Sequence, residues 1–133
     1  MNSFHLKNII DADRGGSLSV LEFSSLSFIP KRIFYVRGVP NNGIRGKHAH
    51  IQCFQIYICI NGEINVHIIN SLGEEHYCNL KKDDCLLIPP FLWTEEQFIG
   101  EESVLLVLCS HEYNKDDYIY SVDELKAVNG KTK

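Results

Sequence analysis

Acidic residues are missing from one long stretch of this chain of 133 residues, although the chain as a whole carries a formal net charge of −4. No Asp or Glu occurs from Phe23 to Gly62, whereas five Lys and Arg residues fall within that segment. A protein that binds nucleic acid or an anionic membrane needs an extended basic surface, so the overall balance argues against both partners. The local cationic segment either consists of solvated loops or predicts a site for an anionic small molecule.

Long apolar runs and paired cysteine motifs are also missing. No window approaches the roughly 20 apolar residues that cross a bilayer, and the first residues lack a basic segment followed by an apolar core. The five cysteines are odd in number, show no CxxC spacing and lie mostly within apolar runs. We therefore expect a soluble cytoplasmic protein with reduced, buried thiols and no membrane span.

Short runs rich in Val, Ile, Phe, Tyr and Cys alternate with Gly, Pro, Asn and Asp, which is a strand pattern. The predicted strands are Ser17–Phe23, Arg32–Arg37, Cys53–Ile60, Ile64–Ile69, Glu75–Leu80, Cys85–Ile88 and Val104–Cys109. No amphipathic segment is long enough for a helix of three turns. The sequence therefore predicts one all-β domain over residues 1–133, a sandwich or barrel, with the jelly roll among the choices.

Two local signals refine this prediction. Asn61-Gly62 separates two predicted strands and favours a two-residue hairpin, because both residues tolerate positive φ. Ser121 followed by Glu124 fits a capping box and predicts a short helix around 122–126, with 127–133 as a flexible tail.

The strongest chemical signal is the pair His48 and His50, which follows Arg45 at the start of a strand. A spacing of two places both imidazoles on one face of a strand. Histidine has a reference pKa near 6.5, so the pair can accept and return a proton at neutral pH, as isomerisation beside a carbonyl requires. The alternative is a pair of solvated surface histidines.

The spacing from His48 and His50 to Gln55 and Gly62 resembles the first sequence motif of the cupin superfamily. Metal-binding cupins supply two His and a Glu from that motif and a further His after a proline. This chain has Gln55 in the third position and no histidine in 89–94. A catalytic metal needs at least three protein ligands and an open position, so we expect none. Strict alternation places Gln55 opposite the histidines, and a bulge in 51–54 would be needed to bring it inside.

Most of the chain resembles the nucleotide-sugar 3,4-ketoisomerases of the cupin superfamily, which act on dTDP-4-keto-6-deoxyglucose. The resemblance rests on RIFY at 32–35, RGKHAH at 45–50, Gln55, Gly62, IPPFLW at 88–93, VLLVLCS at 104–110, Tyr113 and DDYI at 116–119. It implies a cupin jelly-roll barrel with a short C-terminal helix, and an isomerase that acts as a homodimer with no metal or other cofactor.

The resemblance also implies the roles of individual side chains. One of the two histidines would move a proton between carbons 3 and 4 of the sugar, and either could be the base. Tyr35 is the candidate for a hydroxyl that stabilises the developing oxyanion. Arg45 would contact the diphosphate, since a guanidinium matches phosphate oxygens. The other expected substrate-binding residues are Arg37, Lys47, Gln55 and Trp93.

Two other functions remain open from the sequence. One is a 3,5-epimerase-like cupin, which leaves the ketone at carbon 4, and the other is a sugar-binding cupin without turnover. Glu95 and Glu96 could supply a further base, but paired carboxylates in a polar segment are expected to be solvated. The expected setting is deoxysugar synthesis for surface polysaccharides such as lipopolysaccharide O-antigen.

Overall fold

The computed structural model describes residues 3–10 and 13–131 and consists mainly of β-strands. The strands are β1 (Ser3–His5), β2 (Lys7–Ile10), β3 (Ser17–Val20), β4 (Arg32–Val36), β5 (Ile44–His50), β6 (Gln55–Ile69), β7 (Glu75–Lys81), β8 (Asp84–Ile88), β9 (Trp93–Cys109) and β10 (Tyr118–Ile119). One helix, α1 (Val122–Lys131), follows them, and 3₁₀ turns lie at Phe23–Ser25 and Lys115–Asp117.

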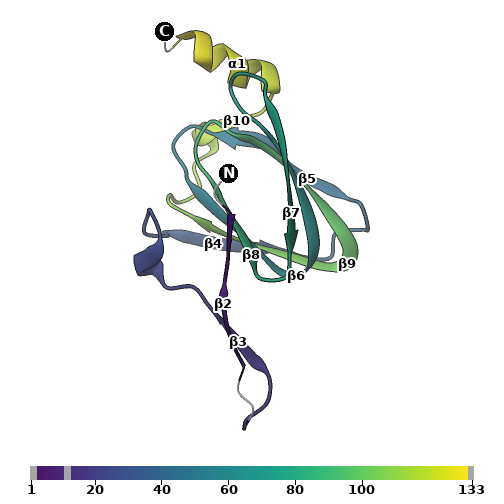
Figure 1. The fold of residues 1–133 in the computed structure, drawn as a ribbon. Helices are drawn as coiled ribbons and strands as arrows, with labels where there is room; N and C mark the ends of the chain where they lie inside the picture. Colours follow the sequence, from purple (N-terminus) through teal and green to yellow (C-terminus); the bar gives the residue numbers. More distant parts are fainter. Residues whose placement is uncertain (1–2, 11–12, 132–133) are drawn as a thin grey trace.

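The two longest strands, β6 and β9, hold the barrel together because they pair antiparallel from one end to the other. One half of this pair carries β8 and β1 on one side and β4 on the other. The other half carries β7 on one side and β5, then β10, on the other. The two halves form the two layers of a closed barrel, with α1 at one end and the β2–β3 hairpin extending beyond the other (Figure 1). The expected jelly-roll barrel is confirmed.

The predicted hairpin at Asn61-Gly62 is wrong, because β6 runs through both residues without reversing. The pairing of β6 with β9 shifts register on either side of Asn61, and Gly62 has a φ of 78°. A glycine with positive φ inside a strand can form a bulge as well as a turn. Here the bulge bends β6 out of one layer and into the other.

The barrel interior is apolar along most of its length. In β6, Ile64, Val66 and Ile68 are at most 1% exposed, whereas Asn65 and His67 between them are partly exposed, as the alternation predicted. Phe98 of β9 is fully buried against them. Burying a side chain of this size contributes about 2 to 3 kcal/mol, so the packing of Phe98 against β6 is a main source of stability.

Helix α1 begins where the capping box predicted, since the Ser121 hydroxyl accepts a hydrogen bond of 3.1 Å from the backbone N–H of Glu124. The helix continues to Lys131, so the expected tail is wrong for 127–131, and 132–133 lie outside the described residues. Leu125 is fully buried in a cluster with Trp93 and Ile119, and such packing extends a helix beyond its local signals. Within the described part of the chain, no helix is long and apolar enough to cross a membrane.

Candidate active site

The two histidines of β5 lie side by side on one face of the strand, as their spacing predicted. Their ring centroids are 5.1 Å apart and the rings are almost perpendicular. Ala49 between them points the other way into a separate core cluster. A bulge after Gly46 interrupts the pairing of β5 with β9, and Lys47 within it has a φ of 65°. The bulge shifts the register of β5 so that His48 lies opposite Thr94 of β9.

His50 is held from behind by Asp117. The Oδ2 atom of Asp117 lies 3.0 Å from Nδ1 of His50. The same carboxylate accepts hydrogen bonds from the backbone N–H groups of Gln52 and Cys53, at 2.7 and 3.2 Å. Because these amides fix the carboxylate as an acceptor, Nδ1 of His50 carries the proton and Nε2 is the free acceptor. Nε2 is buried without a hydrogen-bond partner.

His48 is neutral in the folded protein. Burial and, to a smaller extent, repulsion between protonated His48 and His50 lower the pKa of His48 from 6.5 to about 4, although a hydrogen bond with the Gly46 backbone partly opposes both effects. Burial penalises the charged imidazolium because a low-dielectric interior solvates it poorly. At neutral pH one ring nitrogen of His48 therefore has a free lone pair and can accept a proton.

A cavity of about 90 Å³ opens beside His48 inside the barrel. Its polar lining residues are Arg45, His48, Gln55, Tyr57 and Glu96, and its apolar lining residues are Phe34, Val36, Phe98, Leu105 and Val107. Gln55 reaches the cavity because residues 51–54 form a bent link between β5 and β6, so the alternation starts again at Gln55. The sequence predicted that Gln55 faces the interior only if 51–54 depart from a regular strand, and they do.

Four of the residues expected at the site lie elsewhere. Alternation along β4 turns Phe34 and Val36 into the cavity and leaves Tyr35 on the outer face, 59% exposed. The Arg37 guanidinium lies 5.9 Å from the Tyr35 ring on that face. Lys47 is exposed and does not line the cavity.

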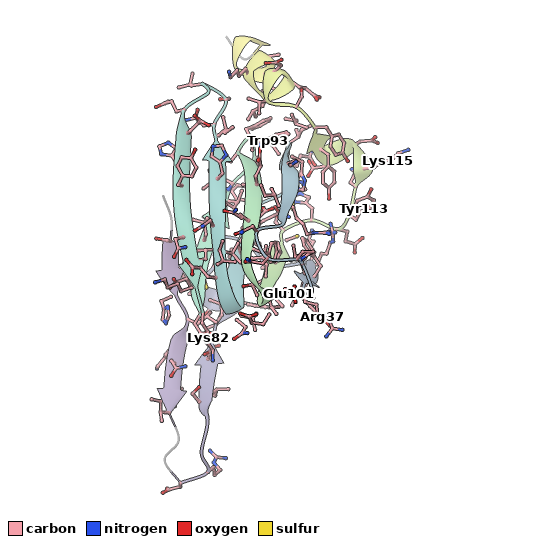
Figure 2. The ribbon with its side chains drawn as sticks, turned by 90° about the vertical axis from the view of Figure 1, so that its right-hand side faces the viewer. Arg37, Lys82, Trp93, Glu101, Tyr113 and Lys115 are labelled. Atoms are coloured by element: carbon pink, nitrogen blue, oxygen red, sulfur yellow. The ribbon has the colours of Figure 1, made fainter. Side chains whose placement is uncertain are left out.

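Trp93 also lies away from the predicted site, because it packs in the core beside α1. Its side chain is 6% exposed, and its Nε1 donates to Oε2 of Glu95 at 2.9 Å. Figure 2 shows Trp93 toward the end of the barrel that carries α1 and Arg37 toward the opposite end. In this chain Tyr35, Arg37, Lys47 and Trp93 therefore do not gather with His48, whereas Arg45 and Gln55 do.

Three side chains that the sequence did not assign complete the site. Asp117 is the support of His50, and the Tyr118 ring lies 5.0 Å from the His48 ring and 4.5 Å from the His50 ring. Burial raises the pKa of Tyr118, so its hydroxyl keeps its proton. Both residues lie in the DDYI segment at 116–119, which was part of the family resemblance but gave no role.

The third is Glu96, and the expectation that it is solvated is wrong. It is 4% exposed because Thr94, Glu96 and Phe98 alternate onto the interior face of β9. Its Oε1 accepts hydrogen bonds from the Tyr57 hydroxyl at 2.5 Å and the Thr94 hydroxyl at 3.0 Å. Burial raises its pKa to about 7, while these hydrogen bonds and the charge of Arg45 act in the opposite direction.

Among the described residues, His50, Cys53 and Asp117 bring a possible set of metal ligands within 4.8 Å of one another. The Asp117 carboxylate already accepts hydrogen bonds from His50 and two backbone amides. A tetrahedral structural site would need a fourth ligand as well. The arrangement accordingly has the character of a hydrogen-bonded support for His50.

Comparison with known proteins points to one family. The chain is 29% identical over 122 residues to the TDP-4-oxo-6-deoxy-alpha-D-glucose-3,4-oxoisomerase of Aneurinibacillus thermoaerophilus, covering 92% of this chain and 87% of the relative. The structure matches QdtA, a sugar 3,4-ketoisomerase from Thermoanaerobacterium thermosaccharolyticum solved with TDP, with a TM-score of 0.88 and 31% identity over 98% of this chain and 95% of that one.

A 3,4-ketoisomerase from Helicobacter canadensis matches with a TM-score of 0.87 and 28% identity, over 97% of this chain and 96% of its own. A variant of QdtA was solved with TDP-4-keto-6-deoxyglucose, and it is 30% identical to this chain. The model of the FdtA family, described as WxcM-like, C-terminal, matches residues 1–130. This match spans the barrel, the histidines and most of α1, and the chain therefore belongs to the FdtA family.

Proposed function

We propose that this protein is an isomerase that converts dTDP-4-keto-6-deoxyglucose into the corresponding 3-keto sugar. The observation that carries the proposal is His48, a neutral imidazole beside a second, anchored histidine on the wall of the barrel cavity. The three named relatives are all described as 3,4-ketoisomerases or oxoisomerases, which supports the same activity.

His48 is the base in this proposal, because it lines the cavity and His50 does not. His48 takes the proton from carbon 3, the electron pair forms a double bond to carbon 4, and the resulting enediolate becomes an enediol when the oxygen on carbon 4 takes a proton. The same imidazole then delivers a proton to carbon 4. His50, held by Asp117, packs edge-on against His48 and fixes the position of its ring.

The remaining roles follow from position. Arg45 is exposed at the cavity mouth and would bind the diphosphate, and Gln55 would contact the sugar. Tyr118 replaces Tyr35 as the hydroxyl donor near the reacting oxygen, because its ring touches both histidines and Tyr35 faces outward.

The test is incubation of purified, chelator-treated protein with dTDP-4-keto-6-deoxyglucose in deuterium oxide, followed by NMR. The expected product is a 3-keto sugar with deuterium at carbon 4, absent in His48→Asn and retained in His76→Asn, whose side chain is exposed on β7. A ketone that stays at carbon 4 with deuterium at carbon 3 or 5 would indicate an epimerase. Binding without any exchange would indicate a sugar-binding protein.

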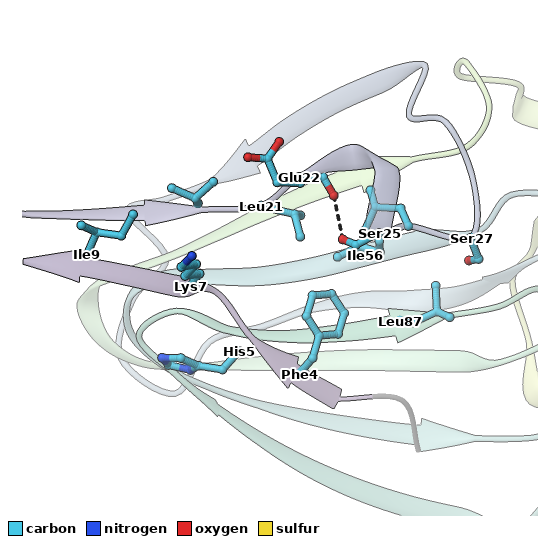
Figure 3. Close-up of a pocket in the computed structure, with 12 residues that line it drawn as sticks. Phe4, His5, Lys7, Ile9, Leu21, Glu22, Ser25, Ser27, Ile56 and Leu87 are labelled. Carbon is cyan, nitrogen blue, oxygen red and sulfur yellow. Dashed lines mark hydrogen bonds between the residues drawn. The ribbon is translucent and has the colours of Figure 1, made fainter.

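We also propose a homodimer in which the N-terminal arm, residues 3–10 and 13–20, packs against a second copy. The arm exposes large apolar side chains that a lone chain leaves in water, including Ile10 at 79% and Leu18 at 60% exposed. Beside it lies a pocket of about 680 Å³, lined by apolar residues such as Phe4, Leu21 and Leu87 (Figure 3). An apolar strip next to an apolar pocket fits a symmetric contact between identical chains.

Ile10→Glu tests the dimer, with Leu72→Glu as the control on an exposed turn between β6 and β7. Light scattering should give twice the chain mass for the natural protein and the control, and the monomer mass for Ile10→Glu. A monomer in all three cases would contradict the proposed dimer.

The five free thiols fit a reducing compartment, so we further propose a cytoplasmic location and a place in deoxysugar synthesis.

A further inference from the structure

Ketoisomerisation moves two hydrogens, and the proposed role of His48 accounts for only one. The first hydrogen passes from carbon 3 to carbon 4. The second leaves the hydroxyl on carbon 3 and ends on the oxygen of carbon 4. That second transfer needs a group that can donate a proton to one oxygen and accept one from its neighbour.

We propose that Glu96 is the group that carries the proton between the two oxygens. This inference rests on the proposed ketoisomerase function and assigns a second catalytic residue to it. Glu96 lines the same cavity as His48, and the register of β5 and β9 sets His48 opposite Thr94 and Arg45 opposite Glu96. Glu96 is thus the next inward-facing residue of β9 after Thr94, the residue opposite the base His48.

The cavity fits the reacting edge of a deoxysugar. Its volume of about 90 Å³ is too small for a whole nucleotide sugar but takes two ring carbons with their oxygens. The polar groups His48 and Glu96 come from the paired strands β5 and β9, whereas Gln55, Phe34 and Val107 belong to the opposite layer. The apolar lining suits the methyl group of a 6-deoxy sugar, and His48 and Glu96 would face the oxygens on carbons 3 and 4.

Only one oxygen of the Glu96 carboxyl accepts hydrogen bonds, and the other lies near the bulge of β5. Oε1 accepts both hydrogen bonds, from Tyr57 and from Thr94. Oε2 lies against Gly46, where any side chain would collide with it. Gly46 therefore gives the carboxyl room in the bulge that also positions His48.

The surroundings suit a carboxyl that uses both protonation states. The charged or titratable groups that face it are Arg45 and His48 from β5 and Tyr57 from β6, with Thr94 from β9 as a neutral donor. Its pKa of about 7 lets acid and carboxylate coexist at neutral pH. General acid–base catalysis is most effective when the catalytic pKa lies near the working pH.

The step balances without any other reagent. As His48 removes the proton from carbon 3, the Glu96 carboxylic acid protonates the carbonyl oxygen on carbon 4 and gives the enediol. Glu96, now a carboxylate, takes the proton from the hydroxyl on carbon 3 as that carbon becomes a ketone and carbon 4 receives its proton. Carbon 3 is oxidised, carbon 4 is reduced, and both side chains return to their starting states.

Glu96→Gln tests the proposal, because glutamine keeps the volume and can still accept from Tyr57 and Thr94 but cannot exchange a proton. Glu95→Gln is the matched control on the neighbouring, partly exposed residue. We expect kcat to fall 10²- to 10⁴-fold in Glu96→Gln, the usual range for loss of an acid–base group, and to stay unchanged in the control. Deuterium exchange at carbon 3 needs Glu96 for one proton transfer, whereas turnover needs it for two, so exchange should fall at least tenfold less than turnover.

The outcomes separate this inference from the proposed function. If the natural protein does not isomerise the sugar, the proposed function fails. If it does and Glu96→Gln is as active as Glu95→Gln, the function stands and the role of Glu96 is refuted. If Glu96→Gln does not fold, Tyr57→Phe is the deciding variant. Loss of the Tyr57 hydrogen bond should raise the pKa of Glu96 and so shift the alkaline limb of the pH profile of kcat to higher pH. An unchanged limb would overturn the proposal.

Discussion

Replacing Glu96 with Gln should change how the free energy of unfolding depends on pH. The ordinary pKa of a glutamate is 4.5, and burial raises that of Glu96 to about 7 in the folded protein. Between these values the folded state holds a proton that the unfolded state has released, so stability falls as pH rises. At about 1.4 kcal/mol per pKa unit, the loss between pH 4.5 and pH 8 amounts to about 3 kcal/mol.

His48 acts in the opposite direction over part of this range. Its pKa is lowered from 6.5 to about 4, so its contribution to stability is present above pH 6.5 and is lost as pH falls toward 4. Because His48 is only partly buried, solvent screening reduces this effect. It is present in both proteins, however, and cancels when the stability of the natural protein is subtracted from that of Glu96→Gln.

Urea denaturation from pH 4.5 to pH 8 measures that difference. The stability of Glu96→Gln relative to the natural protein should rise by about 3 kcal/mol up to pH 7 and then level off. Glu95→Gln should show no such rise, since Glu95 is partly exposed. A difference that stays constant within about 0.5 kcal/mol would mean that the pKa of Glu96 is the same in the folded and unfolded states, and the effect of burial would be refuted.

Three further predictions concern the support of His50, the absence of a metal and the bend in β6. Asp117→Asn cannot hold the proton on Nδ1 of His50, so kcat should fall 10²-fold or more with little change in KM, while Asp116→Asn, on an exposed residue, should match the natural protein. Dialysis against a chelator should leave turnover intact; loss of activity that zinc restores would point instead to His50, Cys53 and Asp117 as ligands. Gly62→Ala should lower the unfolding free energy by about 2 to 4 kcal/mol in urea, because φ is 78° and the new Cβ would collide with Ser103; an unchanged midpoint would contradict the bulge.

Local patterns determined much of the fold and the central pair of the site. Alternation in 64–69, the apolar run at 104–109 and the capping box at Ser121 are features of neighbouring residues, and each keeps its predicted structure. The spacing of His48 and His50 likewise fixes their common face, because a strand alternates with a period of two whatever surrounds it.

Tertiary structure decided what adjacent residues could not. Whether Asn61-Gly62 reverses the chain or bends it depends on β9, which pairs with β6 on both sides of the glycine. The buried Glu96 carboxyl finds a hydrogen-bond donor inside the barrel in Tyr57, which comes from a distant strand. Asp117 reaches His50 across 67 residues of sequence, and the choice of His48 as the base depends on which imidazole meets the cavity. These are properties of enclosure and long-range pairing, and no local pattern in a single sequence encodes them.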